Sequence, residues 1–141
     1  EEAGEAICKL LCIQFKETTV INHLADVKHF IGHARKLGIR IALDNFGAGA
    51  TSFGHLKLLR IDELKVDGQF MRDLLTDPLN DAAMRFFVTV AKATKAKTVA
   101  KFVDSAEVLA LIREMGIDYA QGDYPHQPEP IEALFNDMTH R

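Results

Sequence analysis

The sequence lacks the features that mark several classes of protein. It has only two cysteines and no apolar run of the roughly 18 residues that a membrane-spanning helix needs. Cys8 and Cys12 have no second Cys or His pair at metal-ligand spacing, so we expect buried, reduced thiols and no zinc site. The first residues are acidic where a signal peptide would be basic. We therefore expect a cytoplasmic protein without a membrane segment.

An excess of positive charge is also missing. The chain carries 17 Lys and Arg against 20 Asp and Glu, for a net charge of −3, and its basic residues are scattered. Binding to long DNA or RNA is disfavoured because it needs a continuous basic track, whereas a small phosphorylated ligand needs only a local positive pocket. A chain of 141 residues that is 48% hydrophobic suits one compact domain, which we expect to span residues 1–141.

Apolar, β-rich runs alternate with segments of helical period along the chain. The predicted strands cover residues 10–15, 39–43, 63–66, 98–103 and 118–120, and the predicted helices cover residues 22–37, 53–59, 69–75, 81–94, 106–115 and 131–138. This alternation is the signature of parallel strands joined by crossover helices. The predicted fold class is therefore α/β, built from parallel β/α units.

Polar residues follow each predicted strand, where the loops of a parallel β/α architecture share one face. They are Gln14 and Glu17, Asp44 and Asn45, Lys65 and Asp67, Lys101 and Asp104, and Gln121. Two interpretations are open at this point. The residues form a shared functional site, or they reflect the ordinary rise in polarity where strands end.

Four of the strand-end segments carry distinctive motifs. They read Leu43-Asp44-Asn45-Phe46-Gly47-Ala48-Gly49, Asp62-Glu63-Leu64-Lys65-Val66-Asp67-Gly68, Thr98-Val99-Ala100-Lys101-Phe102-Val103 and Asp118-Tyr119-Ala120-Gln121-Gly122. In this order and spacing they resemble successive signatures of the EAL family of bacterial cyclic di-GMP phosphodiesterases. The resemblance runs from about residue 11 to residue 134 and implies the later part of a modified TIM barrel, incomplete as a barrel. The segment with the Glu-Ala-Leu signature has no counterpart.

The resemblance implies roles for five residues. Asp44 matches the first Asp of the family's Asp-Asp-Phe-Gly motif, which is a metal ligand, and Lys65 matches the lysine beside the attacking water. Gln121 matches a glutamine near the metal and the substrate. Glu17 matches the second acid of a Glu-x-Thr-Glu motif, and Asp104 replaces the last Glu of a Val-Ala-Glu-Gly-Val-Glu stretch.

Three positions depart from the family pattern towards positive charge. Gln14 stands where the Glu-x-Thr-Glu motif supplies a metal-binding Glu, Asn45 replaces the second Asp, and Lys101 replaces the first Glu of the Val-Ala-Glu-Gly-Val-Glu stretch. One extra positive charge about 6 Å from a divalent ion costs roughly 5 kcal/mol at an effective dielectric constant near 20. The resemblance therefore implies a degenerate site with no expected cofactor.

These departures predict a catalytically inactive regulatory module that acts through a protein partner or self-association. An incomplete barrel exposes the edges of its sheet, which favours such association. Cyclic di-GMP is a second candidate ligand, held by Lys65, Lys101, Gln121 and Asn45. An ion pair between Lys101 and Asp44 is the alternative to this ligand site.

The opposing hypothesis is a residual metal-dependent phosphodiesterase. It would use Mg²⁺ or Mn²⁺ held by Asp44, Glu17 and Asp104, with Lys65 beside the water. In the inactive module, Asp44 and Lys65 are only vestiges of this catalytic site.

Two further groups of residues have simpler explanations. His29 and His33 have the i, i+4 spacing that can bind zinc, but no third ligand is evident, so we predict a solvent-facing pair. Four phenylalanines fall on apolar faces of the predicted elements and are expected in the core: Phe70, Phe86, Phe87 and Phe102.

Overall fold

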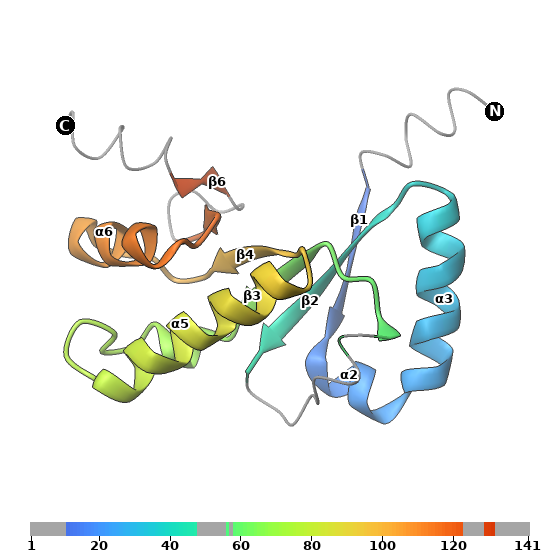
Figure 1. Cartoon of the computed structure of the whole chain (residues 1–141), viewed down its shortest axis with the longest axis horizontal. Coiled ribbons are helices and arrows are strands. Elements are labelled where there is room, and N and C mark those ends of the chain that lie inside the picture. The colour runs from blue at the N-terminus through green and yellow to red at the C-terminus, as the bar shows by residue number, and fades with distance from the viewer. Residues whose placement is uncertain (1–10, 48–55, 57, 123–128, 132–141) are drawn as a thin grey trace.

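The computed structural model describes residues 11–47, 56, 58–122 and 129–131, which form one six-stranded sheet. The strands are β1 (Cys12–Lys16), β2 (Arg40–Phe46), β3 (Glu63–Val66), β4 (Lys97–Ala100), β5 (Tyr119–Ala120) and β6 (Glu129–Pro130). They lie side by side in sequence order, β1 to β5 parallel and β6 antiparallel to β5 (Figure 1). The predicted α/β class with parallel β/α units is confirmed.

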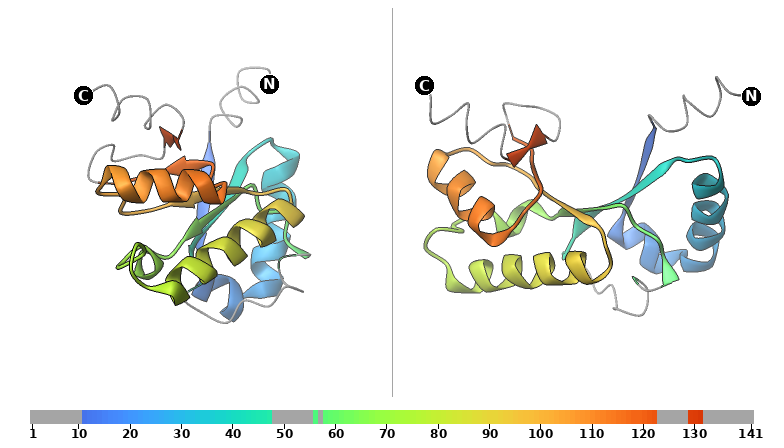
Figure 2. Two further views of the ribbon diagram at one scale, coloured as in Figure 1. Left: turned by 60° about the vertical axis from the view of Figure 1, so that its left-hand side comes forward. Right: turned by 45° about the horizontal axis from the view of Figure 1, so that its top comes forward.

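The helices pack at both ends of this sheet. They are α2 (Glu17–Asn22), α3 (Leu24–Lys36), α5 (Pro78–Ala93) and α6 (Ala106–Met115), with a short 3-10 helix η1 (Gly68–Phe70). Helix α3 lies beside the β1 end, whereas α5 and α6 lie towards the β4 and β5 end (Figures 1 and 2). In the part of the chain that the structure describes, no helix has the length and apolarity needed to cross a bilayer.

Local sequence signals set the ends of the later helices. The Asp77 carboxylate accepts a hydrogen bond from the backbone N–H of Leu79 at 2.9 Å, and Pro78 takes the first position of α5, where its missing N–H costs nothing. Ser105 Oγ accepts from the backbone N–H of Val108 at 3.2 Å and caps α6. Gly116 ends α6 in the left-handed region, at φ 96°.

The core lies between the sheet and its helices. Side chains alternate along each strand, so that Ile41, Leu43 and Leu64 face the helices and are at most 1% exposed. Helices α5 and α6 contribute Met84 and Ile112, both fully buried. This packed layer fixes the strands and so positions the polar residues at their carboxyl ends.

Two element predictions were wrong, and one helix was not predicted. The helix predicted over residues 22–37 forms as α3, which begins at Leu24, and the unpredicted helix α2 precedes it with Val20 and Glu17 buried despite the β-branched residues between them. The predicted strand over residues 98–103 ends at Ala100, since Phe102 adopts a positive φ of 61°. Of the helix predicted over residues 69–75, only η1 forms. The predictions for residues 53–59 and 131–138 lie mostly outside the described residues.

The four phenylalanines divide evenly between core and surface. Phe87 is 8% exposed and makes edge-to-face contacts with the rings of Phe46 and Phe70. Phe86 is 50% exposed and Phe102 is 64% exposed, so the predicted burial of these two is wrong. Phe86 lies on α5, and Phe102 lies beyond the end of β4.

Cys12 is a free thiol on β1 that is half-buried, and Cys8 lies outside the described residues. Burial, followed by the negative charge of Glu63, raises the pKa of the Cys12 thiol above its ordinary value. The thiol therefore stays protonated and unreactive at neutral pH.

A buried polar clamp joins the starts of β4 and β5. Thr98 is 1% exposed, and its Oγ1 accepts from the backbone N–H of Asp118 at 3.0 Å while it donates to Asp118 Oδ2 at 3.2 Å. The same carboxylate oxygen accepts from the backbone N–H of Thr98 at 3.0 Å.

Thr98→Val is expected to lower the free energy of unfolding by about 1–3 kcal/mol, because it removes the acceptor of the Asp118 N–H without changing the side-chain shape. Urea denaturation measures this loss. Thr89→Val is the matched control, because the exposed Thr89 hydroxyl only donates to the carbonyl of Arg85 on its own helix. Its effect is expected to stay within about 0.5 kcal/mol. Equal effects of the two variants would contradict a role for the clamp.

Candidate functional site

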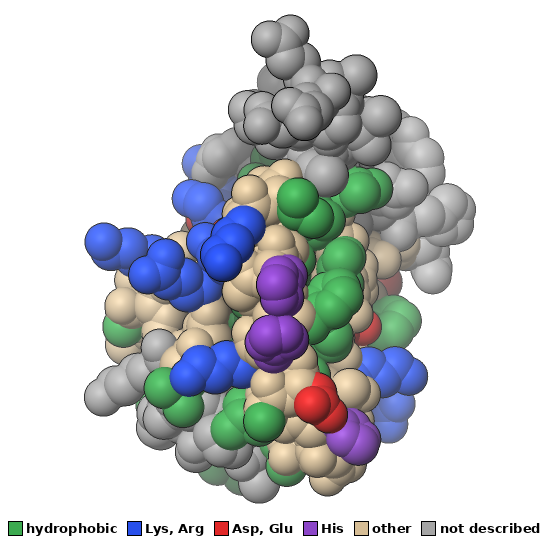
Figure 3. Space-filling view, turned by 90° about the vertical axis from the view of Figure 1, so that its right-hand side faces the viewer, with side chains coloured by type: hydrophobic (Ala, Val, Ile, Leu, Met, Phe, Trp, Pro, Cys, Tyr) green, Lys and Arg blue, Asp and Glu red, His purple; other side chains and the backbone are tan. Residues whose placement is uncertain are grey.

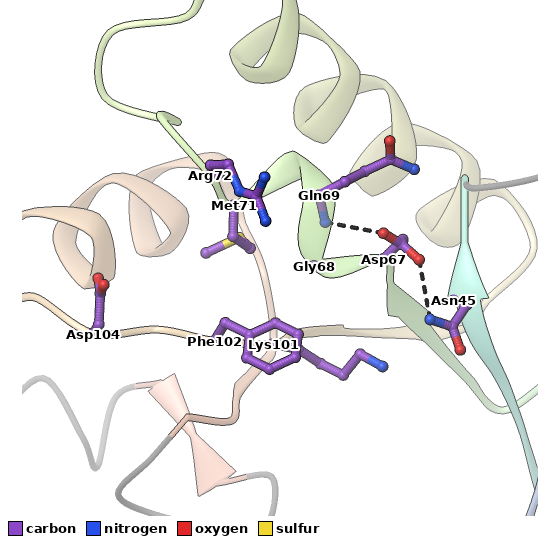
Figure 4. Close-up of a pocket in the computed structure, with 9 residues that line it drawn as sticks. All are labelled: Asn45, Asp67, Gly68, Gln69, Met71, Arg72, Lys101, Phe102 and Asp104. Carbon is purple, nitrogen blue, oxygen red and sulfur yellow. Dashed lines mark hydrogen bonds between the residues drawn. The ribbon is translucent and has the colours of Figure 1, made fainter.

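A pocket of about 590 Å³ opens at the carboxyl ends of β2, β3 and β4 (Figure 4). It is lined by Asn45, Asp67, Gly68, Gln69, Met71, Arg72, Lys101, Phe102 and Asp104. Several of the residues predicted from strand ends therefore do share one face of the sheet. The charged groups of this lining are two cations and two carboxylates, so the pocket wall is mixed in sign.

An ion pair between Lys101 and Asp44 lies next to this pocket. Lys101 Nζ donates to Asp44 Oδ1 at 2.6 Å, and the two side chains are only 15% and 19% exposed. The same oxygen also accepts from the backbone N–H of Asn45 at 2.9 Å. The contact reaches from the end of β4 across β3 to β2, so the carboxylate that the resemblance assigns to a metal instead neutralises an ammonium group.

Glu17 is held by the backbone of the turn after β2. Its side chain is buried, with the residue 2% exposed, and Oε2 accepts from the backbone N–H of Gly47 at 3.0 Å. Gly47 has a φ of 96°, and a Cβ there would come within 2.7 Å of the rings of Phe70 and Phe87. The second predicted metal ligand therefore stabilises a tight turn at the edge of the site.

Asn45 connects this turn to the loop after β3. Its Nδ2 donates to Asp67 Oδ2 at 3.0 Å, and Asp67 Oδ1 accepts from the backbone N–H of Gln69 at 2.9 Å, which caps η1 (Figure 4). An amide donor suits this position, because an ionised aspartate facing Asp67 would repel it. Asn45 also tolerates its φ of 57° better than most residues do.

The remaining predicted site residues differ in burial and in their distance from the pocket. Lys65 lies on β3 and is 5% exposed, and Gln121 directly follows β5 with a buried Oε1. Gln14 is exposed on β1. Asp104 is exposed and lies at the far end of the pocket from Asn45, so the structure does not bring it to Asp44 (Figure 4).

Phe102 is a wall of the pocket that sequence reasoning missed. Its ring lies so close to Gly68 that a Cβ on the glycine would be 2.3 Å from it. Phe102 stands at the glycine of the Val-Ala-Glu-Gly-Val-Glu stretch and keeps the positive φ, 61°, that a glycine adopts easily. A phenylalanine in place of that glycine was the signal that could have identified it. Arg72 and Gln69, which carried no motif, were also missed.

The residues present do not fit a divalent ion of the kind that the resemblance implies. Among residues 11–47, 56, 58–122 and 129–131, no group of three or more His, Cys, Asp or Glu is arranged to hold a metal. The Lys101 ammonium lies on the Asp44 oxygen that such an ion would use. We therefore assign no metal-dependent step to this site.

Comparison with known proteins matches the chain to one family. The family model described as the EAL domain matches residues 2–128. The chain is 34% identical over 121 residues to the cyclic di-GMP phosphodiesterase PdeA of Borreliella burgdorferi. This match covers 86% of the chain but 18% of PdeA, so the chain spans less than a fifth of that relative's length.

Solved structures give the same result. The complex of the PaMucR phosphodiesterase with cyclic di-GMP superposes with a TM-score of 0.79 at 26% identity, covering 89% of this chain and 51% of PaMucR. The manganese and cyclic di-GMP complex of Klebsiella pneumoniae BlrP1 superposes with a TM-score of 0.77 at 25% identity, covering 87% of this chain and 31% of BlrP1. The predicted resemblance is confirmed, and the chain belongs to the EAL domain family, of whose TIM-barrel-like fold it contains part.

Proposed function

We propose that this chain is a catalytically inactive EAL-like module, one partial domain over residues 1–141, that acts in signalling by binding and not by hydrolysis. The observation that carries the proposal is the 2.6 Å contact between Lys101 Nζ and Asp44 Oδ1. Phosphodiester hydrolysis by this family's two-metal chemistry needs carboxylates free to hold divalent ions.

The ion pair opposes metal binding in two ways. It occupies an Asp44 oxygen, and it keeps a positive charge within a few ångströms of the position that an ion would take. If the Lys101 side chain, which is now 15% exposed, moved away to admit an ion, its ammonium would lose its partner Asp44. If the ammonium stayed in place, its charge would cost the ion roughly 5 kcal/mol at about 6 Å. The second route alone weakens metal affinity by several powers of ten.

The proposed mode of action is association with a protein partner or with a second copy. Among the described residues, β1 pairs with β2 on one side only and has no strand partner on its other side, and an unpaired strand edge favours association. Apolar side chains near this edge support the proposal: Leu11 is 46% exposed, and Phe30, which contacts the ring of Phe15 on β1, is also 46% exposed. Light scattering over a range of concentrations measures self-association directly.

Cyclic di-GMP is the second proposed ligand, and it would bind without a metal. The guanidinium of Arg72 lines the pocket beside the exposed ring of Phe102, whereas the ammonium of Lys101 is already paired with Asp44. Phosphate groups favour a cation such as that of Arg72, and nucleobases stack on aromatic faces. Cyclic di-GMP is present in the PaMucR and BlrP1 complexes, which supports this class of ligand.

The Lys101→Glu variant is expected to bind Mn²⁺ at least tenfold more tightly than the unaltered protein, because the substitution removes the blocking ammonium and adds a carboxylate. Calorimetry measures the affinity. Lys97→Glu is the matched control, since it makes the same charge change at the exposed, opposite end of β4.

The unaltered protein is expected to show no hydrolysis of cyclic di-GMP with Mg²⁺ or Mn²⁺. Turnover that disappears in Asp44→Ala would instead establish the residual phosphodiesterase, with Glu17, Asp104 and Lys65 as its other site residues.

Phe102→Gly is expected to raise the free energy of unfolding by about 1 kcal/mol, because glycine relieves the left-handed backbone strain and the exposed ring loses few contacts. Phe102→Ala is the control, since it removes the ring but keeps the Cβ that causes the strain. Urea unfolding separates the two variants, and an equal response would contradict a strained backbone at this position.

Calorimetry in the absence of metal tests whether the protein binds cyclic di-GMP. If a base stacks on Phe102, Phe102→Ala is expected to weaken cyclic di-GMP binding about tenfold, consistent with roughly 1–3 kcal/mol for a stacked base. Phe86→Ala is the matched control, because Phe86 is also half-exposed but lies on α5 and does not line the pocket. An absence of heat at high micromolar ligand would leave the protein partner as the proposed target.

A further inference from the structure

Two histidines form a close pair on the outer face of α3. His29 and His33 are one helical turn apart, and both are exposed, which confirms the predicted solvent-facing pair. Their Nε2 atoms are 3.2 Å apart, and their ring centroids are separated by 4.7 Å. Figure 3 looks onto this face and shows adjoining histidine side chains, with lysine and arginine on one side and hydrophobic side chains on the other.

We propose that His29 and His33 are a bidentate site for a transition-metal ion of the zinc, nickel or copper class. Such an ion binds imidazole nitrogen at about 2.0–2.1 Å, which places two nitrogens about 3.4 Å apart in a tetrahedral shell and about 2.9 Å apart at a right angle. The observed separation of 3.2 Å lies between these two values. The i, i+4 spacing on the helix therefore allows the two nitrogens to lie at a separation that the ion can bridge.

The chemistry of binding needs no other reactant. The two Nε2 atoms lie within hydrogen-bonding distance, and in the tautomer in which one of them carries the hydrogen, that hydrogen lies between them at the position of the ion. When the ion binds, that hydrogen moves through solvent to Nδ1 of the same ring, and both neutral rings present an Nε2 lone pair. Hard ions such as Mg²⁺ prefer oxygen ligands and are not expected to bind here.

The surroundings leave room for the rest of the coordination shell. A hollow of about 460 Å³ beside the pair is lined by Ala25, Lys28, His29, Gly32, His33 and Lys36. A Cβ added to Gly32 would meet nothing within 4 Å, so the space between the two turns is open. Water is expected to complete the shell, because the described residues contain no group of three suitable protein ligands.

Two lysines moderate the affinity. Lys28 and Lys36 carry positive charge at the margin of the hollow, but both are exposed and screened by solvent. They lower the affinity for a cation without blocking the nitrogens. The site is on α3, apart from the strand-end pocket, and does not depend on the proposed function.

Titration of the full chain with Ni²⁺ or Zn²⁺, followed by calorimetry and by NMR of the imidazole groups, tests the site. We expect one ion bound at this site, with His29→Ala and His33→Ala each weakening its binding at least tenfold. His23→Ala is the matched control, because His23 is an exposed histidine at the start of α3 and outside the hollow, and it should change the affinity less than twofold.

A second variant provides a gain of function. Lys36→Gln removes a nearby charge and is expected to raise the affinity two- to threefold at low salt, with a smaller gain at high salt. Circular dichroism checks that each variant keeps its helices. The proposal is overturned if the folded His29→Ala protein binds the ion as tightly as the unaltered protein, or if neither metal binds at millimolar concentration.

Discussion

The contact between Lys101 and Asp44 determines what the strand-end pocket can do. It joins two side chains that are 57 residues apart in sequence and that project from strands on either side of β3. In a partly buried setting such a pair is held by charge and by hydrogen bonding together, and neither partner can be removed cheaply. The resemblance to the EAL family implies an acidic residue at the position of Lys101, and the site has an internal cation there instead.

Other acidic residues of the site have also acquired structural partners. Glu17 holds the turn at Gly47, and Asp67 caps η1 while it accepts from Asn45. Each of these carboxylates accepts from one backbone N–H group, that of Gly47 in a part-buried position and that of Gln69 in an exposed one. The loops at the carboxyl ends of β2 and β3 are thus fixed by acids, and this network stabilises the shape of the pocket without a bound ion.

Two positions at the rim carry a left-handed backbone without glycine, Asn45 and Phe102. Asparagine is well suited to this conformation, whereas phenylalanine is strained in it. The strain at Phe102 is tolerated next to a pocket that its own ring helps to form. The exposed aromatic surface is thus linked to the proposed binding role, since a purely structural loop would gain stability from glycine at this point.

The sequence by itself determined the class of the fold, with its parallel β/α units, and the identity of the family. Hydrophobic periodicity and four ordered motifs are local properties, so the strands that carry the core residues Ile41, Leu43 and Leu64 were predicted from them. The N-cap residue Ser105 and the N1 proline Pro78 are local signals of the same kind. The sequence also left two possible roles for Lys101, a contact with a ligand or an ion pair with Asp44.

Only the tertiary structure decided between these alternatives, because a contact across three strands depends on register and side-chain direction. The tertiary structure also shows that Asp104 lies away from Asp44, that Phe102 is exposed and that Glu17 is a buried hydrogen-bond acceptor. Helix α2 was missed because the burial of Val20 outweighs the weak helical preference of its neighbours. The fold follows from patterns along the chain, whereas the chemistry of the site follows from distances between strands.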